Sequence, residues 1–120
     1  MNRYHESMSD DLIKEIEDKF PWIKEAEIEN AILTINDDEL VWKNGIWRDG
    51  IWHNGEWHSG KWHKGRWYDG IWLNGTWYNG KWYNGEWLDG AWFNGTWYNG
   101  TWRDGIWCNG TWHEGIGKPF

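Results

Sequence analysis

The sequence predicts an all-β solenoid, a coil of short strands stacked along one axis, with a short capping helix before it. Tryptophan recurs at every fifth position from Trp42 to Trp112, and a glycine stands three residues after each of these fifteen tryptophans. Asn or Asp precedes that glycine in twelve of the fifteen units. Because Asn-Gly and Asp-Gly favour positive φ, the chain should turn after every three residues of extended structure. Units that pack on their neighbours bury a core even with few aliphatic residues.

A meander of tiny hairpins is the alternative that the Asn-Gly dipeptides suggest, and the segment from Trp82 to Trp87 resembles a tryptophan-zipper hairpin. Backbone N–H and C=O groups alternate sides along a strand. In a strand of three residues the first and last residues point to the same side, although a meander needs them to face different neighbours. A uniform hairpin ladder therefore cannot satisfy its hydrogen bonds. The strict period of five favours the solenoid, where every unit has an equivalent environment.

Units such as Gly75-Thr76-Trp77-Tyr78-Asn79 resemble the pentapeptide-repeat family, whose unit has a small and a large apolar position. The resemblance covers 41–120, and Ala26-Glu27-Ile28 and Ala31-Ile32-Leu33 are nearer to the usual Ala-x-Leu pattern of the family. It implies a right-handed, four-sided β-helix with glycine at the small inward position. The departure is Trp in place of Leu. The chain also resembles MORN repeats more weakly, and its Trp-x-Asn-Gly runs are similar to those of phage-encoded proteins.

The number of sides depends on the spacing at which outward residues match. A spacing of twenty residues, or four units per coil, aligns Asp49 with Asp69. A spacing of fifteen, or three units per coil, aligns Tyr68 with Tyr83. The residues leave both arrangements open, and the family resemblance favours four sides.

The regions outside the repeat predict a cap. We expect an acidic N-terminal segment with a capping helix at 1–21, a β-rich junction at 22–40, the repeat at 41–116 and a tail at 117–120. Ser9 is a good N-cap for a helix over 9–20, and Pro21 ends it. Asn36-Asp37-Asp38 indicates a turn within the junction.

Charge is concentrated in the cap. Residues 1–40 carry four basic and twelve acidic side chains, a net charge of −8, and the remaining eight basic and seven acidic side chains give the rest of the chain +1. An acidic chain without a basic stripe is a poor nucleic-acid ligand, so we expect no nucleic-acid partner. The single cysteine, Cys108, and the lack of a signal or membrane-spanning run predict a cytoplasmic protein, or one incorporated into a virion or other particle.

Function should reside at outward positions, since the perfect period of the tryptophans marks them as core. The residue after each Trp is aromatic or aliphatic in the middle of the repeat, which is typical of a binding surface. The candidate surface residues are Tyr68, Leu73, Tyr78, Tyr83, Leu88, Phe93 and Tyr98.

A binding protein is favoured over an enzyme. His53, His58 and His63 fall on successive units and should diverge, so we expect no metal site, and no cofactor or catalytic constellation is indicated. The chain is predicted to be a non-catalytic scaffold for a protein partner or for self-association, without a membrane partner. The alternatives are a carbohydrate-binding module and, from the family resemblance, a DNA mimic acting on topoisomerases, which would need ordered negative charge along the repeat.

Overall fold

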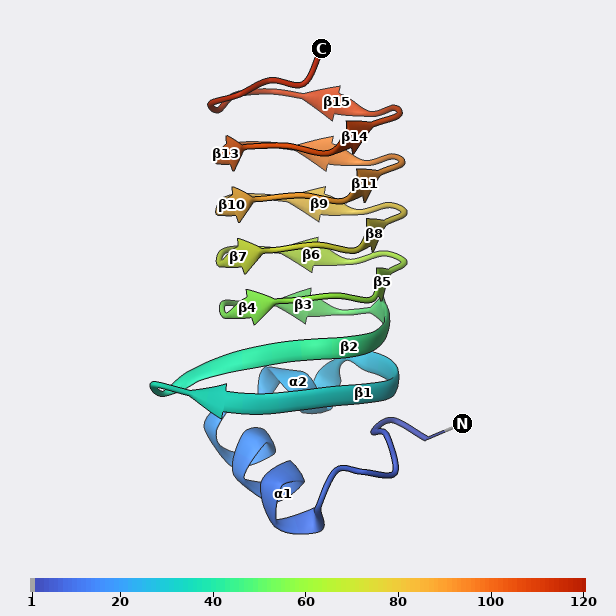
Figure 1. Cartoon of the computed structure of the whole chain (residues 1–120), viewed down its shortest axis with the longest axis vertical. Coiled ribbons are helices and arrows are strands. Elements are labelled where there is room, and N and C mark those ends of the chain that lie inside the picture. The colour runs from blue at the N-terminus through green and yellow to red at the C-terminus, as the bar shows by residue number, and fades with distance from the viewer. Residues whose placement is uncertain (1) are drawn as a thin grey trace.

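A computed structural model describes residues 2–120, and its main body is a β-solenoid of five coils (Figure 1). Two helices and a long β-hairpin lie at the N-terminal end, and the coils stack above them. The molecule measures 44 × 29 × 20 Å. The predicted all-β solenoid with an N-terminal helix is confirmed.

The helices and the hairpin strands come first along the chain: α1 (Asp10–Lys19), α2 (Trp22–Glu25), β1 (Glu27–Asn36) and β2 (Glu39–Asp49). Thirteen two-residue strands follow, and each consists of a tryptophan and the residue before it. They are β3 (Ile51–Trp52), β4 (Glu56–Trp57), β5 (Lys61–Trp62), β6 (Arg66–Trp67), β7 (Ile71–Trp72), β8 (Thr76–Trp77), β9 (Lys81–Trp82), β10 (Glu86–Trp87), β11 (Ala91–Trp92), β12 (Thr96–Trp97), β13 (Thr101–Trp102), β14 (Ile106–Trp107) and β15 (Thr111–Trp112).

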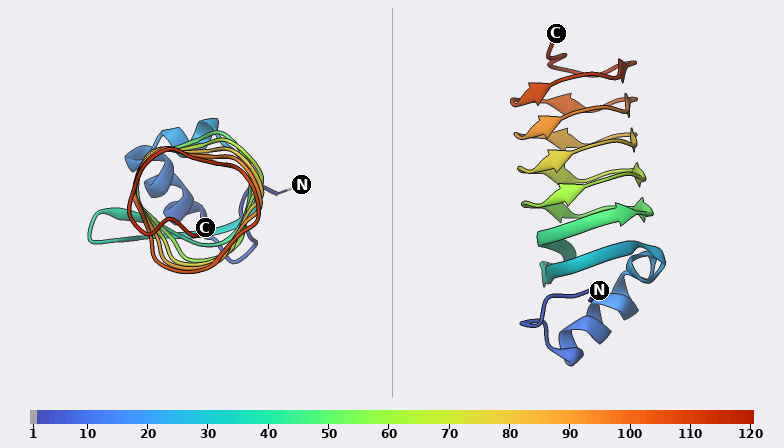
Figure 2. Two further views of the ribbon diagram at one scale, coloured as in Figure 1. Left: turned by 90° about the horizontal axis from the view of Figure 1, so that it is seen from above. Right: turned by 90° about the vertical axis from the view of Figure 1, so that its right-hand side faces the viewer.

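The solenoid has three sides, which corrects the expected four. Parallel strands pair residues fifteen apart, so three five-residue units complete one coil, as in the pairing of Trp57 with Trp72. Side one carries β4, β7, β10 and β13, side two carries β5, β8, β11 and β14, and side three carries β3, β6, β9, β12 and β15. Strand β2 supplies the first rung of sides one and two. Seen along the axis, successive coils superpose (Figure 2).

The core explains why three sides suffice. Each coil places three indoles edge to face, with ring centroids 5.8–5.9 Å apart, as between Trp57 and Trp62 or Trp62 and Trp67. Between coils the indoles stack face to face at 4.7–5.0 Å, as between Trp57 and Trp72. Trp42 and the next eleven tryptophans of the repeat are fully buried. Three indoles fill the cross-section, so a fourth side would leave an empty centre, which close-packed interiors avoid.

Glycine is required at the corners for two reasons. The glycines of the repeat have φ between +114° and +133°, a region that L-residues avoid. A Cβ on Gly70 would also collide with the carbonyl oxygen of Gly55 in the coil below. The glycines therefore pack along the axis against the neighbouring coil, and some also lie against the core, because a Cβ on Gly75 would come within 3.1 Å of Trp57 Nε1. The coils are joined by bonds such as Leu73 N–H to the Trp57 carbonyl, 2.7 Å.

The hairpin of β1 and β2 begins the solenoid. Its antiparallel strands are joined by Asp37 and Asp38, both with positive φ, which confirms the predicted turn. Leu33 lies opposite Trp42 and Ile28 opposite Trp47, so these side chains begin two of the tryptophan columns. A Cβ on Gly45 would collide with the backbone of Ala31, and a Cβ on Gly50 would touch Ala26, so the first two corner glycines are needed for packing against the cap.

The third column begins at Trp22, whose ring meets Trp52 edge to face at 5.2 Å. Trp22 belongs to the short helix α2, so the first part of the junction is helical, where β-structure was expected. Pro21 follows the end of α1, and its fixed φ suits the start of the helical turn of α2. Below it, α1 runs over the expected residues, and the Ser9 hydroxyl accepts a bond from Leu12 N–H at 3.1 Å, as predicted for its N-cap.

Residues 2–5 complete the cap. Tyr4 forms a parallel bridge with Ala31 beneath β1. The Arg3 guanidinium donates hydrogen bonds to the carbonyls of Ala26, 2.6 Å, and Ile23, 2.8 Å. The Tyr4 hydroxyl donates to Glu17 at 2.7 Å, and burial raises the pKa of Tyr4 to about 12, with the Glu17 bond adding to the shift. These contacts fix the N-terminal segment against both helices and the hairpin.

Candidate interaction surfaces

The sequence-predicted surface residues are divided among all three sides. Side one carries Leu73 and Leu88, which are half-buried. Side two carries Tyr78 and Phe93, and side three carries Tyr68, Tyr83 and Tyr98. Within a side the structure brings these residues together as ladders along the axis. It does not bring the three ladders onto one face.

Side three presents one continuous aromatic ladder. Tyr68 and Tyr83 stack at 4.7 Å, Tyr83 and Tyr98 at 4.9 Å, and Tyr98 and His113 at 5.0 Å. His53 begins the ladder, 5.9 Å from Tyr68. Stacking covers the ring faces and leaves mainly their edges for solvent. A sugar ring packs on an exposed aromatic face, so this ladder offers a poor platform for one.

Side two has a different character in coils three to five, which are the coils that contain Trp77, Trp92 and Trp107 on this side. Its outward residues are Thr76, Tyr78, Ala91, Phe93, Ile106 and Cys108, and none is charged at neutral pH. Tyr78 stacks on Phe93 at 5.4 Å. The exposed fractions are 37% for Tyr78, 43% for Phe93 and 64% for Ile106. We call these six residues the uncharged face, and it holds three of the exposed large apolar side chains, Tyr78, Phe93 and Ile106.

Sequence reasoning missed Ile106 on this face. It precedes a tryptophan, whereas the candidate residues all follow one. In a two-residue strand with an inward Trp, the residues before and after it both point outward, because side chains alternate. Aligning outward residues at a spacing of fifteen would have placed Ile106 one rung above Ala91.

The same side is charged nearer the cap. Arg48 makes a two-bond ion pair with Glu29, 2.7 and 2.9 Å, and this bonding is the main reason that the pKa of Glu29 lies below its usual value. Lys64 lies 3.7 Å from Asp49. The pKa of His63 is lowered, first by burial and then by nearby Arg48 and Lys61. Side two is therefore charged near the cap and uncharged in coils three to five.

Side one carries polar contacts between its outward side chains. Arg103 lies 3.2 Å from Glu86 in the coil below, and His58 lies 3.1 Å from Glu56 in its own coil. The three histidines considered as metal ligands, His53, His58 and His63, stand on sides three, one and two respectively. Residues 2–120 contain no group of three or more potential ligands positioned for a metal ion.

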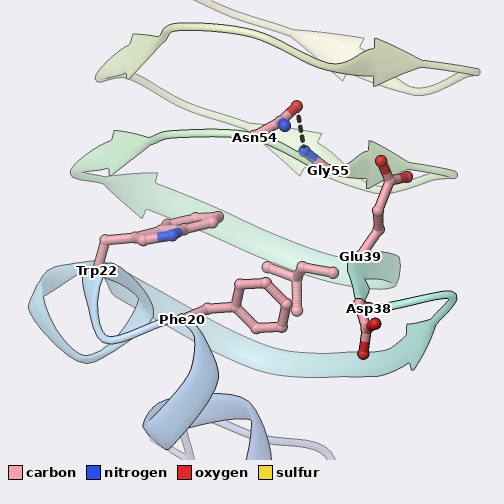
Figure 3. Close-up of a pocket in the computed structure, with 7 residues that line it drawn as sticks. Phe20, Trp22, Asp38, Glu39, Asn54 and Gly55 are labelled. Carbon is pink, nitrogen blue, oxygen red and sulfur yellow. Dashed lines mark hydrogen bonds between the residues drawn. The ribbon is translucent and has the colours of Figure 1, made fainter.

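A small pocket lies where the cap meets the first coil (Figure 3). Phe20 and Trp22 form its aromatic wall, and the hairpin residues Asp38 and Glu39 bring carboxylates to the opposite rim. Lys19 Nζ already lies 3.5 Å from Asp38 Oδ1. An ammonium group of the chain itself thus stands beside the acidic rim.

No family model, curated protein or solved structure matches the chain. Within residues 2–120, neither helix has the length and apolar character that a membrane crossing requires.

Proposed function

We propose that this chain is a non-catalytic scaffold of the pentapeptide-repeat type, which binds another protein through the uncharged face. The single observation that carries the proposal is the cluster of Tyr78, Phe93 and Ile106 on one side of coils three to five, all exposed. Apolar clusters of this kind on a rigid support are typical of protein-binding surfaces.

The rigidity of the support strengthens this interpretation. Stacked indoles hold each rung against its neighbours, so the outward side chains are fixed relative to one another before binding. A surface ordered in advance loses less conformational entropy on association. The proposed scaffold therefore presents its apolar side chains at little entropic cost.

The two alternatives have less support. Sugar binding is disfavoured because Tyr83, in the middle of the side-three ladder, has a stacked ring on each face. A DNA mimic needs ordered negative charge, and residues 41–120 carry a net charge of +1. A glycan array that showed specific binding would favour the carbohydrate module instead, and inhibition of gyrase supercoiling would favour the mimic.

The test compares variants of two ladders. The tagged protein is used as bait in a lysate, and retained proteins are identified by mass spectrometry. Replacing Phe93 by Lys should abolish retention of a specific partner, whereas replacing Tyr83 by Lys on side three should preserve it. Near-ultraviolet circular dichroism must show that both variants keep the tryptophan core. A partner lost equally with both variants, or with neither, would contradict the assignment to the uncharged face.

A further inference from the structure

The Asn-Gly and Asp-Gly corners of the solenoid fall into two classes that differ in hydrogen bonding. In the first class, the side-chain Oδ1 of Asn or Asp accepts a bond from the N–H of the following glycine at 2.8–2.9 Å. This class consists of Asn44, Asp49, Asn54, Asp69, Asn74, Asn79, Asp89, Asn99 and Asp104. The bond occupies the glycine N–H with the neighbouring side chain.

The second class includes the three remaining Asn-Gly corners, Asn84, Asn94 and Asn109. Here the backbone carbonyl of the asparagine accepts a bond from a buried indole N–H in the coil below. The donors are Trp67, Trp77 and Trp92, at 3.1–3.2 Å. Within residues 2–120, the N–H groups of the three following glycines have no hydrogen-bond acceptor.

This difference bears on the spontaneous chemistry of Asn-Gly. The glycine nitrogen loses its proton to hydroxide and attacks the asparagine Cγ, forming a C–N bond. The bond from Cγ to the side-chain nitrogen then breaks, and this nitrogen takes a proton from water and leaves as ammonia, which regenerates hydroxide. The product is a five-membered succinimide, and water opens it to aspartate or isoaspartate. The reaction needs no oxidant or reductant, and glycine, having no side chain, leaves the nitrogen unhindered.

Both features of the second class favour the attack. First, the glycine N–H is free of the side-chain bond, which must break before the nitrogen can act as a nucleophile. Second, the indole donates to the carbonyl oxygen of the same peptide group, Asn94 C=O to Gly95 N–H for example. A donor on that oxygen stabilises the negative charge left when the nitrogen loses its proton, as oxyanion-hole donors do. The indole therefore makes the nitrogen easier to deprotonate.

We propose that Asn84, Asn94 and Asn109 are sites of selective self-deamidation, activated by the indoles stacked beneath them. The solenoid already holds Asp at four corners of the other class, so an aspartate product suits the fold. Each conversion adds one negative charge. Asn94 and Asn109 follow Phe93 and Cys108 of the uncharged face, so their conversion places carboxylates along its border.

The experiment measures deamidation at all eight Asn-Gly corners in one sample. The folded protein is incubated in mildly alkaline buffer, digested, and each peptide is followed by mass spectrometry and an isoaspartate assay. Asn84, Asn94 and Asn109 should react about fivefold faster than Asn44, Asn54, Asn74, Asn79 and Asn99, a factor equivalent to one ordinary hydrogen bond. In urea-unfolded protein the eight rates should converge.

The control variant replaces Trp77 by Phe, which removes one indole N–H and keeps an aromatic ring. Deamidation at Asn94 should slow toward the rate of the first-class corners, in which the asparagine side chain accepts a bond from the glycine N–H. Asn84 and Asn109 should keep their rates. If this variant fails to fold, the comparison of folded and unfolded wild-type protein still decides. Equal rates at all eight Asn-Gly corners of the folded protein, or faster reaction at the five first-class corners, would overturn the proposal. It would also be overturned if no corner reacted in the folded protein while the unfolded chain did react.

Discussion

The first and last coils of the solenoid have the same sequence pattern but different neighbours. Trp42, Trp47 and Trp52 of the first coil are fully buried because the hairpin and α2 lie beneath them. Trp107 and Trp112 of the last coil are partly exposed, although Phe120 packs over Trp107 at 5.4 Å. Each indole thus gains burial from the coil on either side of it. The stability of such a repeat protein includes a contribution from each contact between neighbouring coils. A coil with a neighbour on only one side is therefore less stable.

The two ends also differ in their backbone groups. Below the first coil, β1 pairs with β2 along its length, and residues 2–5 pair with β1. Above the last coil, Ile116 bonds to Trp102 and Gly100, whereas the Trp107 and Trp112 carbonyls have no backbone donor among residues 2–120. Open strand edges of this kind favour pairing with a strand of another molecule. The cap therefore protects one end of the coil much more fully than residues 116–120 protect the other.

The largest expected effect comes from removing each end in turn. Deleting residues 1–40 uncovers three tryptophan columns and the β2 edge, so the truncated chain should aggregate and lose its near-ultraviolet dichroism. Deleting 116–120 should leave a soluble, folded protein that is less stable by about 1–3 kcal/mol, the value of one buried aromatic contact. Size-exclusion chromatography measures the aggregation of each truncated chain, and urea unfolding measures its stability. A soluble, folded chain without residues 1–40 would show that the cap is dispensable.

Single tryptophans should show the same asymmetry on a smaller scale. Trp72→Ala removes an indole with stacked partners above and below, and should cost about 3–5 kcal/mol. Trp112→Ala removes an indole stacked only on Trp97, so its cost should be less than half of that. Urea midpoints of the two variants give the comparison. Equal losses would mean that coils do not contribute through their neighbours.

Arg3 should be the residue on which the N-terminal segment depends. Arg3→Ala leaves the Ile23 and Ala26 carbonyls without its charged donor, and should destabilise the protein by about 1.5–3 kcal/mol. The matched control is Arg103→Ala, which breaks an exposed pair with Glu86 and should cost about 1 kcal/mol or less. If the two substitutions cost the same, the Arg3 contacts do not hold the cap.

The ion pair at the base of side two should give the smallest effect, visible as pH dependence. The pKa of Glu29 is lowered from 4.5 in the folded protein, chiefly by its bonds to Arg48. Its contribution to stability is therefore complete above the unfolded pKa and is lost as the pH falls through the folded pKa. Glu29→Gln should flatten the acid limb of a stability–pH curve, and Glu27→Gln serves as the neighbouring control. Identical curves for wild type and Glu29→Gln would show that the pair contributes nothing.

Local patterns predicted much of this structure from sequence. The inward tryptophans, the Asn/Asp-Gly corners, the Ser9 cap and the turn at Asp37 and Asp38 each follow from properties of a few adjacent residues. The number of sides does not, because it depends on how three indoles of one coil fit together in space. The spacing-of-fifteen match between Tyr68 and Tyr83 was the correct signal for it.

The surface was harder to predict for the same reason. Whether Phe93 and Tyr83 share a face depends on the number of sides, so the candidate residues could be named but not grouped. The role of Arg3 had no local signal, since its partners lie twenty and more residues away along the chain. The division of Asn-Gly corners into two classes also follows from contacts between coils, which the repeating sequence does not distinguish.

The most direct test of three units per coil is disulfide cross-linking between outward positions in a Cys108→Ser background. Tyr68→Cys with Tyr83→Cys places the two cysteines on adjacent rungs with Cα atoms about 4.8 Å apart, within the Cα–Cα range that a disulfide spans. Tyr68→Cys with Leu88→Cys separates them onto sides three and one. Mild oxidation, followed by mass spectrometry of the digested monomer, should show a nearly complete disulfide for the first pair and none for the second. A disulfide between positions 68 and 88, with none between 68 and 83, would contradict the three-sided solenoid.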